Sequence, residues 1–158
     1  MVPVIRLGLT EYVTALEIQE RLHSRVANGE LPAVLLLLNH PHIYTIGRRG
    51  NSEDIHLSPK KLIELGVEIH QTGRGVQVTY HGPGQIVAYP IINLKQLGIG
   101  PMLYIRVLEQ ILINTLAEFG IPAESEGHPT GVWTGGAKIA AIGVRVSRGV
   151  TTHGFALN

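Results

Sequence analysis

The sequence predicts an α+β protein with a mixed, mainly antiparallel sheet and helices packed against it. Two stretches have the apolar spacing of amphipathic helices, and several short runs rich in Val, Ile and Leu are bounded by glycine, proline or asparagine. Helices and strands do not alternate regularly along the chain, as they do in doubly wound folds. With 158 residues and no internal repeat or linker, residues 1–158 are expected to form one domain.

The first elements follow from turn and cap residues. Residues 4–8 are expected to form a short strand, and Thr10 is suited to cap the helix that follows and that Asn28-Gly29 ends. The continuous apolar run 33–38 is typical of a strand that is buried on both faces. Residues 42–47 follow as a second extended segment.

Two further helices are predicted from proline at their first turn. Ser58-Pro59 is a strong helix start, Gly66 ends that helix, and a strand is expected at 67–70. Pro101 opens a longer helix, whose apolar residues recur at helical spacing. We expect that stripe to lie in the core; it consists of Leu103, Val107, Leu108, Ile111, Leu112, Leu116 and Phe119.

Residues 72–85 are the most informative stretch. Five of these fourteen residues are glycine or proline, which excludes a helix and predicts a strand–turn–strand hairpin with the apolar run 86–92. Six residues offer hydrogen-bonding or charged groups: Arg74, Gln77, Thr79, Tyr80, His81 and Gln85. The functional interpretation is a polar ligand site on a stiff hairpin. The alternative is a polar surface hairpin whose glycines serve the turn alone.

A second region begins near residue 131 and is expected to contain strands at 138–146 and 151–158, joined by a turn at 147–149. Lys138 follows two glycines at the start of the first strand, and a lysine partly removed from water there can act as acid, base or nucleophile. The alternative is that Lys138 only marks a strand edge. His81 and His153, each beside a glycine, can move protons or serve as structural hydrogen bonders.

Composition excludes several classes of function. The net charge of +1 argues against a nucleic-acid platform, although Arg48, Arg49, Lys60 and Lys61 form a weak basic cluster. Without cysteine these residues can form neither a disulfide nor a thiol nucleophile, and the eight histidines show no metal-ligand spacing. No secretory signal, P-loop or Gly-x-Ser-x-Gly elbow is present, and the run 33–38 is too short to cross a membrane. A cytoplasmic enzyme or binding protein is expected.

Several separate blocks of the sequence resemble one enzyme family. The blocks are RGVQVTYHGPGQ at 74–85, His40-Pro41 upstream, and GVW at 131–133, KIAAIG at 138–143, Arg145-Val146 and HGFALN at 153–158 downstream. In this order they resemble the octanoyltransferases of lipoate biosynthesis, also called lipoyl/octanoyl transferases. The likeness extends over nearly the whole chain, and the twelve-residue block is distinctive.

The resemblance implies a biotin/lipoate protein ligase-like fold and a cytoplasmic acyltransferase of protein lipoylation without a cofactor or metal. Its donor would be octanoyl-acyl carrier protein. Its acceptors would be lysines on the lipoyl domains of 2-oxoacid dehydrogenases and on the glycine cleavage H protein. No nucleic acid or membrane partner is implied.

The resemblance also implies the site. Lys138 falls on the family's active lysine, which lowers the pKa of a neighbouring thiol and carries the proton between attacking and leaving groups. The implied acyl and substrate contacts are Arg74, Gly75, Val76, Gln77, Val78, Thr79, Tyr80, His81, Ala141, Ile142, Gly143, Gly154, Phe155 and Ala156. Backbone N–H groups at 141–143 and 154–156 are expected to polarise the thioester carbonyl.

The chain departs from the family pattern at two points. Val76 stands where the family usually has a second glycine, and the family's nucleophilic cysteine lies in a Pro-Cys-Gly segment beyond the position of Asn158. We therefore expect a missing carboxy-terminal portion that carries the thiol. The alternatives are a naturally shortened chain that binds acyl groups without turnover, and an ATP-dependent lipoate or biotin ligase of the same fold, to which Gly73-Arg74-Gly75 bears a likeness.

Overall fold

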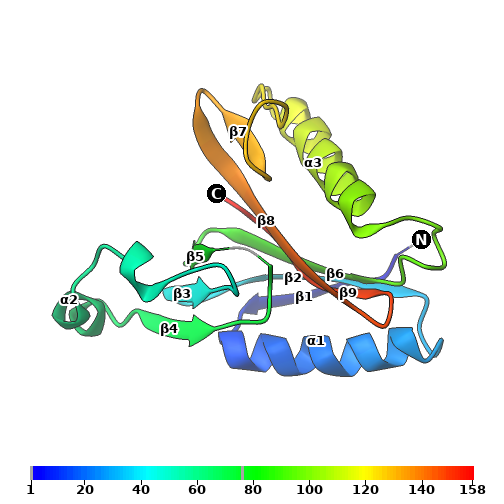
Figure 1. Cartoon of the computed structure of the whole chain (residues 1–158), viewed down its shortest axis with the longest axis horizontal. Helices are drawn as coiled ribbons and strands as arrows, with labels where there is room; N and C mark the ends of the chain where they lie inside the picture. Colours follow the sequence, from blue (N-terminus) through cyan, green and yellow to red (C-terminus); the bar gives the residue numbers. More distant parts are fainter. Residues whose placement is uncertain (1, 76) are drawn as a thin grey trace.

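The computed structural model describes residues 2–75 and 77–158, so Val76 lies outside the described residues. Within them the strands form a six-stranded sheet in the order β1-β2-β6-β9-β8-β7 and a three-stranded sheet in the order β4-β3-β5 (Figure 1). The elements are β1 Val4–Leu9, α1 Tyr12–Ala27, β2 Ala33–Asn39, β3 Ile43–Ile46, the 3₁₀ turn Ser52–Asp54, α2 Pro59–Glu64, β4 Glu68–Gln71, β5 Val78–His81, β6 Ile86–Ile92, α3 Pro101–Glu118, β7 Val132–Thr134, β8 Ala137–Ser147 and β9 Val150–Leu157.

The expected α+β class is confirmed. The β1–β2 and β3–β4 pairs are parallel, and the other pairs within the described residues are antiparallel. Helix α1 packs on β6 and β9, whereas α3 packs on β7 and β8 (Figure 1). Along β9, Ala156 belongs to the α1 cluster, while Phe155 and Leu157 pack with the α3 cluster. The two helices therefore cover opposite faces of the large sheet.

Strand β2 alternates between buried and half-buried residues, so the expectation that it is buried on both faces is wrong in part. The expected N-cap of α1 is also wrong. The helix starts one residue later, with Glu11 at the cap position and no side-chain cap. The Thr10 hydroxyl instead donates to the carbonyl of Leu7 at 3.2 Å, because the backbone N–H of Thr10 is tied to Asn39 at the end of β2.

The strand–turn–strand pattern at 72–92 is correct, but the expected hairpin is wrong. Strand β5 pairs with β3 in the small sheet, while β6 pairs with β2 and β9 in the large sheet. The turn between them contains Gly84 at φ +89°, where a residue with a Cβ would be strained. The segment is therefore a corner that carries the chain from one sheet to the other.

Helix α3 runs as predicted, but its buried face is one residue out of phase with the expected stripe. Tyr104, Leu108, Leu112 and Leu116 are buried at i, i+4 spacing, so Leu108, Leu112 and Leu116 are in the core as expected. The remaining residues of the expected stripe are exposed: Leu103, Val107, Ile111 and Phe119. Two adjacent apolar stripes on one helix left the phase ambiguous in the sequence.

Candidate active site

Two adjoining cavities lie where the small sheet meets the β8–β9 ribbon. The larger, which we call the Lys138 cleft, has a volume of about 520 Å³. Its walls come from the corner segment, from β8 and β9, and from the loops after β3 and before β7: Arg49, Gly75, Gln77, Val78, Thr79, Tyr80, Gln85, Pro129, Thr130, Lys138, Ala141, Ile142, Ala156 and Asn158.

The smaller space, which we call the His81 cavity, has a volume of about 30 Å³. Its lining residues are Tyr12, Arg74, Thr79, His81, Tyr89, Ala141, Ile142, Gly143, His153, Gly154, Phe155 and Ala156. Four of them also line the Lys138 cleft, namely Thr79, Ala141, Ile142 and Ala156. The two spaces are therefore parts of one site.

Small residues form the common floor. Ala141 pairs with Ala156 and Gly143 pairs with Gly154 across the β8–β9 ladder, so two methyl groups and two residues without a side chain leave a shallow channel. Gly154 is required for packing as well, since a Cβ there would meet the Cδ of Pro90 at 2.6 Å. A channel with so few projecting atoms can accept an unbranched apolar chain.

The sheet itself uses most backbone N–H groups of this floor. The Asn158 N–H donates to the Ile139 carbonyl at 2.9 Å, so the odd-numbered residues of β8 direct their backbone groups towards β9. By the same alternation Ala141 and Gly143 face β9. Ile142 faces the outer edge instead, where β7 pairs with β8 only as far as Ala140.

The expected polarising role of the 154–156 amides is therefore wrong. Strand β9 lies between β6 and β8, with Phe155 opposite both Ala88 and Ile142, so N–H groups on either edge meet a neighbouring strand. Among residues 141–143 and 154–156, Ile142 is the one that directs its N–H away from a ladder. A carbonyl in the cleft can take a hydrogen bond from that group.

Lys138 stands at the start of β8 beside the cleft. Its Nζ donates to the Thr130 carbonyl at 3.1 Å and lies 4.9 Å from the centre of the Trp133 ring, which is its cross-strand neighbour. The side chain is exposed, so the expected partial removal from water is wrong. The carbonyl and the ring hold the ammonium in place while it stays open to an incoming group.

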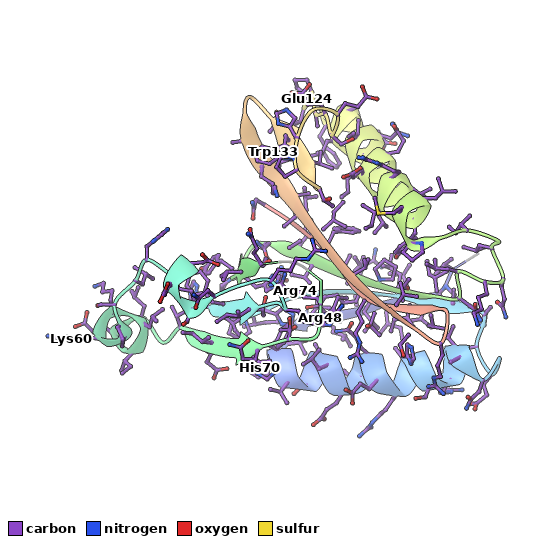
Figure 2. The ribbon with its side chains drawn as sticks, viewed as in Figure 1. Arg48, Lys60, His70, Arg74, Glu124 and Trp133 are labelled. Atoms are coloured by element: carbon purple, nitrogen blue, oxygen red, sulfur yellow. The ribbon has the colours of Figure 1, made fainter. Side chains whose placement is uncertain are left out.

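Arg74 is the buried cation of the site, with 5% of its surface exposed. Its Nη2 donates to the carbonyl of Thr45 at 2.5 Å and to the Thr45 hydroxyl at 2.6 Å. Burial lowers the pKa of Arg74 from its ordinary value. Figure 2 shows Arg74 and Arg48 near the middle of the view and Lys60 at one end of the molecule, so the expected basic cluster is not a single patch.

Two neutral imidazoles line the His81 cavity. Burial lowers the pKa of His81 to about 4, although the hydrogen bond that His81 Nδ1–H donates to Gln85 Oε1 acts in the opposite direction. Burial likewise lowers the pKa of His153 to about 4, and its backbone has a positive φ of 57°. At neutral pH both rings are uncharged, so they accept or donate hydrogen bonds without adding to the charge of Arg74.

Contacts between aromatic and imidazole rings behind these groups join α1 to both sheets. The His40 ring lies 5.5 Å from His81 and 5.2 Å from Tyr12, and His40 Nε2 lies 2.7 Å from the Tyr89 hydroxyl. His40 was noted in the sequence only as part of a family block, and Tyr12 and Tyr89 were not singled out as site residues. Their place in the site depends on contacts between distant segments, which no local pattern signals.

The described members of the predicted site therefore lie together. Every one of them lines one or both of the two spaces. Gln85 and Asn158, which were not among the predicted contacts, line the cleft as well.

Among the described residues no group of histidine, aspartate and glutamate side chains is placed to hold a metal ion. No helix in the described part of the chain is long and apolar enough to cross a bilayer.

Comparison with known families supports one interpretation. The sequence profile described as the lipoyl protein ligase A/B catalytic domain matches residues 11–158. A protein named octanoyltransferase from Geobacter metallireducens is 49% identical over 152 residues, which cover 96% of this chain and 68% of the relative. An octanoyltransferase from Caldicellulosiruptor saccharolyticus is 51% identical, with 98% of this chain and 67% of the relative covered.

Solved structures share the fold at low sequence identity. P. falciparum LipL1 in complex with lipoate has a TM-score of 0.77 at 16% identity, and the match covers 99% of this chain and 47% of that one. A lipoate-protein ligase A bound with ATP has a TM-score of 0.76 at 15% identity, with 99% of this chain and 66% of that one covered. The present chain spans about half the length of the first structure.

Proposed function

The chain belongs to the family of lipoyl protein ligase A/B catalytic domains, and we propose that it transfers an octanoyl or lipoyl group from acyl carrier protein to a lysine of a lipoyl domain. The resemblance seen in the sequence is confirmed, and so is the lipoate/biotin ligase fold. The octanoyltransferase relatives also confirm the expected acyltransferase class. The acceptors we propose are lipoyl domains of 2-oxoacid dehydrogenases and the glycine cleavage H protein, in the cytoplasm.

One observation carries the proposal. A single cleft of about 520 Å³ has a fixed ammonium, that of Lys138, beside a floor of small apolar residues. An acyl thioester has a matching outline, because it is an unbranched apolar tail joined to one polar carbonyl. With the tail along Ala141 and Ala156, the carbonyl lies near the Ile142 N–H and the Lys138 ammonium.

The proposed reaction has two balanced steps. In the first, a thiolate attacks the donor thioester, a new carbon–sulfur bond replaces the old one, and the donor leaves as a thiol after taking a proton through Lys138. In the second, the acceptor lysine amine attacks the acyl-enzyme, a carbon–nitrogen bond replaces the carbon–sulfur bond, and the amine proton returns through Lys138 to the thiolate. The 158 residues contain no cysteine, so we propose that the thiol is supplied from outside them.

The complete gene product tests this proposal. It is incubated with octanoyl-acyl carrier protein and an apo lipoyl domain, and the mass of the lipoyl domain is followed. We expect octanoylation without ATP, and a fall of about 10²- to 10⁴-fold after Lys138→Ala. Lys60→Ala, a lysine on α2 far from the cleft, is the matched control and leaves the rate unchanged.

The rival functions give different results in the same experiment. Transfer that requires ATP and free acid would identify a ligase instead. Tight binding of a hydrolysis-resistant octanoyl thioether without any transfer would identify an acyl-binding module. Normal turnover of Lys138→Ala would remove the role proposed for that lysine.

A further inference from the structure

Gln85 connects three segments beside the proposed site. Its Nε2 donates to the Asn158 Oδ1 at 2.8 Å, at the end of β9, and to the Tyr80 carbonyl at 3.3 Å, in β5. Its Oε1 lies 2.8 Å from the Nδ1 of His81. Its backbone carbonyl accepts a hydrogen bond of 2.6 Å from the Asn39 side chain. The glutamine is thus held on both its backbone and its amide group.

These contacts determine the orientation of the amide. A carbonyl oxygen only accepts hydrogen bonds, so the Gln85 atom facing the Tyr80 carbonyl must be the NH₂ group. The Gln85 oxygen therefore faces His81 and needs a donor. In a neutral imidazole this donor is Nδ1–H, which leaves a lone pair on Nε2.

The lone pair on His81 Nε2 has no partner within the described residues. Its ring neighbour His40 is already engaged at both nitrogens, since Nδ1–H donates to the Thr10 carbonyl and Nε2 accepts from the Tyr89 hydroxyl. Arg74 directs its Nη2 to Thr45. His81 lines the His81 cavity, which adjoins the Lys138 cleft and shares four lining residues with it, so this acceptor is open to an N–H group that enters from that side.

We propose that Gln85 is a positioning residue that fixes the Nδ1–H tautomer of His81, so that His81 Nε2 receives an N–H of the acceptor lysine amine. This inference rests on the proposed function, because the amine is the substrate group in that reaction that carries N–H donors. A hydrogen bond to Nε2 orients the nitrogen lone pair of the amine towards the acyl carbon. Lys138 remains the group that takes the proton.

The electrostatic surroundings of His81 favour an acceptor that stays neutral. Arg74 lies on the preceding segment, Tyr12 approaches from α1, and His40 and His153 approach from the large sheet. Of these groups Arg74 carries a charge at neutral pH, and that charge opposes protonation of His81. His81 can therefore accept a hydrogen bond across the neutral pH range without acting as the base.

The tautomer is measured directly, without any need for activity. Two-bond ¹⁵N–¹H correlation spectra of the imidazoles distinguish Nδ1–H from Nε2–H, and His81→Asn identifies the signal of His81. We expect Nδ1–H in the natural protein and a shift towards Nε2–H in Gln85→Leu. Gln96→Leu, an exposed glutamine remote from the site, is the matched control and leaves the spectrum unchanged. An Nε2–H signal in the natural protein would overturn the proposal, whatever the transfer assay gives.

Kinetics then separate positioning from a purely structural role. In the complete gene product, Gln85→Leu is expected to lower kcat/KM for the lipoyl domain about tenfold, with the KM for the octanoyl donor unchanged, because one hydrogen bond to the amine is lost. Gln85→Glu keeps an acceptor at Nδ1, and its carboxylate favours protonated His81, which has no lone pair for the amine. We expect that variant to recover activity as pH rises. Equal losses for donor and acceptor in Gln85→Leu, or a pH profile of Gln85→Glu identical to the natural one, would contradict the proposal.

Discussion

Gly154 offers the sharpest test of the packing beneath the site. An added methyl group in Gly154→Ala would meet the Ala88 carbonyl and the Cδ of Pro90, the latter at 2.6 Å, which is well inside van der Waals contact. Strand β9 is held between β6 and β8, so the backbone has little freedom to move away. A residue with a Cβ at position 154 would therefore displace a neighbouring strand.

The magnitude follows from two opposing effects. Overpacking of this kind costs about 1–3 kcal/mol, whereas replacing glycine by alanine stabilises by about 0.4–1 kcal/mol through the unfolded chain. The net loss is about 1–2 kcal/mol, which corresponds to a fall in melting temperature of about 2–8 °C for a chain of this size.

Urea unfolding and thermal melts measure this change. Gly75→Ala is the matched control, because a Cβ at that position has nothing within 4 Å and its φ is not positive. The control is expected to be as stable as the natural protein or slightly more stable. If Gly154→Ala unfolded at the same urea concentration as Gly75→Ala, the close contact between β9 and β6 would be refuted.

Three further predictions follow from the same structure. Ala141→Leu fills the floor and is expected to weaken binding of an octanoyl thioether at least tenfold in calorimetry, with an acetyl thioether affected less; equal losses for both would contradict a tail-binding floor. His81 and His153 have folded-state pKa values of about 4, below the unfolded value of 6.5, so the stability that they contribute is complete above pH 6.5 and is lost progressively towards pH 4. The urea concentration at the unfolding midpoint should therefore fall from pH 7.5 to 5.5 to 4.5. Equal midpoints at the three pH values would count against the burial of these two histidines as neutral rings. Leu108→Ala, at 5% exposure, should cost about 2–5 kcal/mol, while Leu103→Ala, at 54%, should change stability by less than about 0.5 kcal/mol, and similar values for both would reject the assigned face of α3.

The sequence was most informative where a local signal has one structural meaning. Ser58 caps α2 through the Lys61 N–H as its position before Pro59 predicted, and Gly66 follows that helix with a positive φ. The turn at 147–149 joins β8 and β9 as expected. Such caps and turns depend on the backbone conformations that single residues allow, so they can be predicted without knowing what the rest of the chain contacts.

Pairing between strands was less accessible. The corner at Gly82–Gln85 has the residues of a hairpin turn, yet β5 and β6 enter different sheets because β3 and β2 offer each of them an edge. The phase of α3 was ambiguous for a related reason, since Leu103 and Leu108 belong to neighbouring stripes that are equally apolar. Spacing predicts an element, but the choice of partner is made by distant segments.

In the candidate site too, residues with a local signal were predicted, whereas residues placed by contacts between distant segments were missed. Lys138 and the segment around Arg74 were predicted from their residue types and from the family blocks, and the structure places them on two adjoining spaces that share four lining residues. Tyr12 and Tyr89 were missed as cavity residues because a tyrosine on an apolar face is ordinary core in any sequence. Gln85 was noted as polar, but its three side-chain contacts involve residues as distant as Asn158.

The corner between β5 and β6 has a mechanical consequence. One wall of the Lys138 cleft belongs to the small sheet and the other to the large sheet, and no ladder of backbone hydrogen bonds joins the two within the described residues. The two walls are therefore held together by side chains, through the ring contacts of His81 with Tyr12 and His40 and the hydrogen bonds of Gln85 to Tyr80 and Asn158. A slight tilt of one sheet against the other would widen or narrow the entrance while leaving every strand intact.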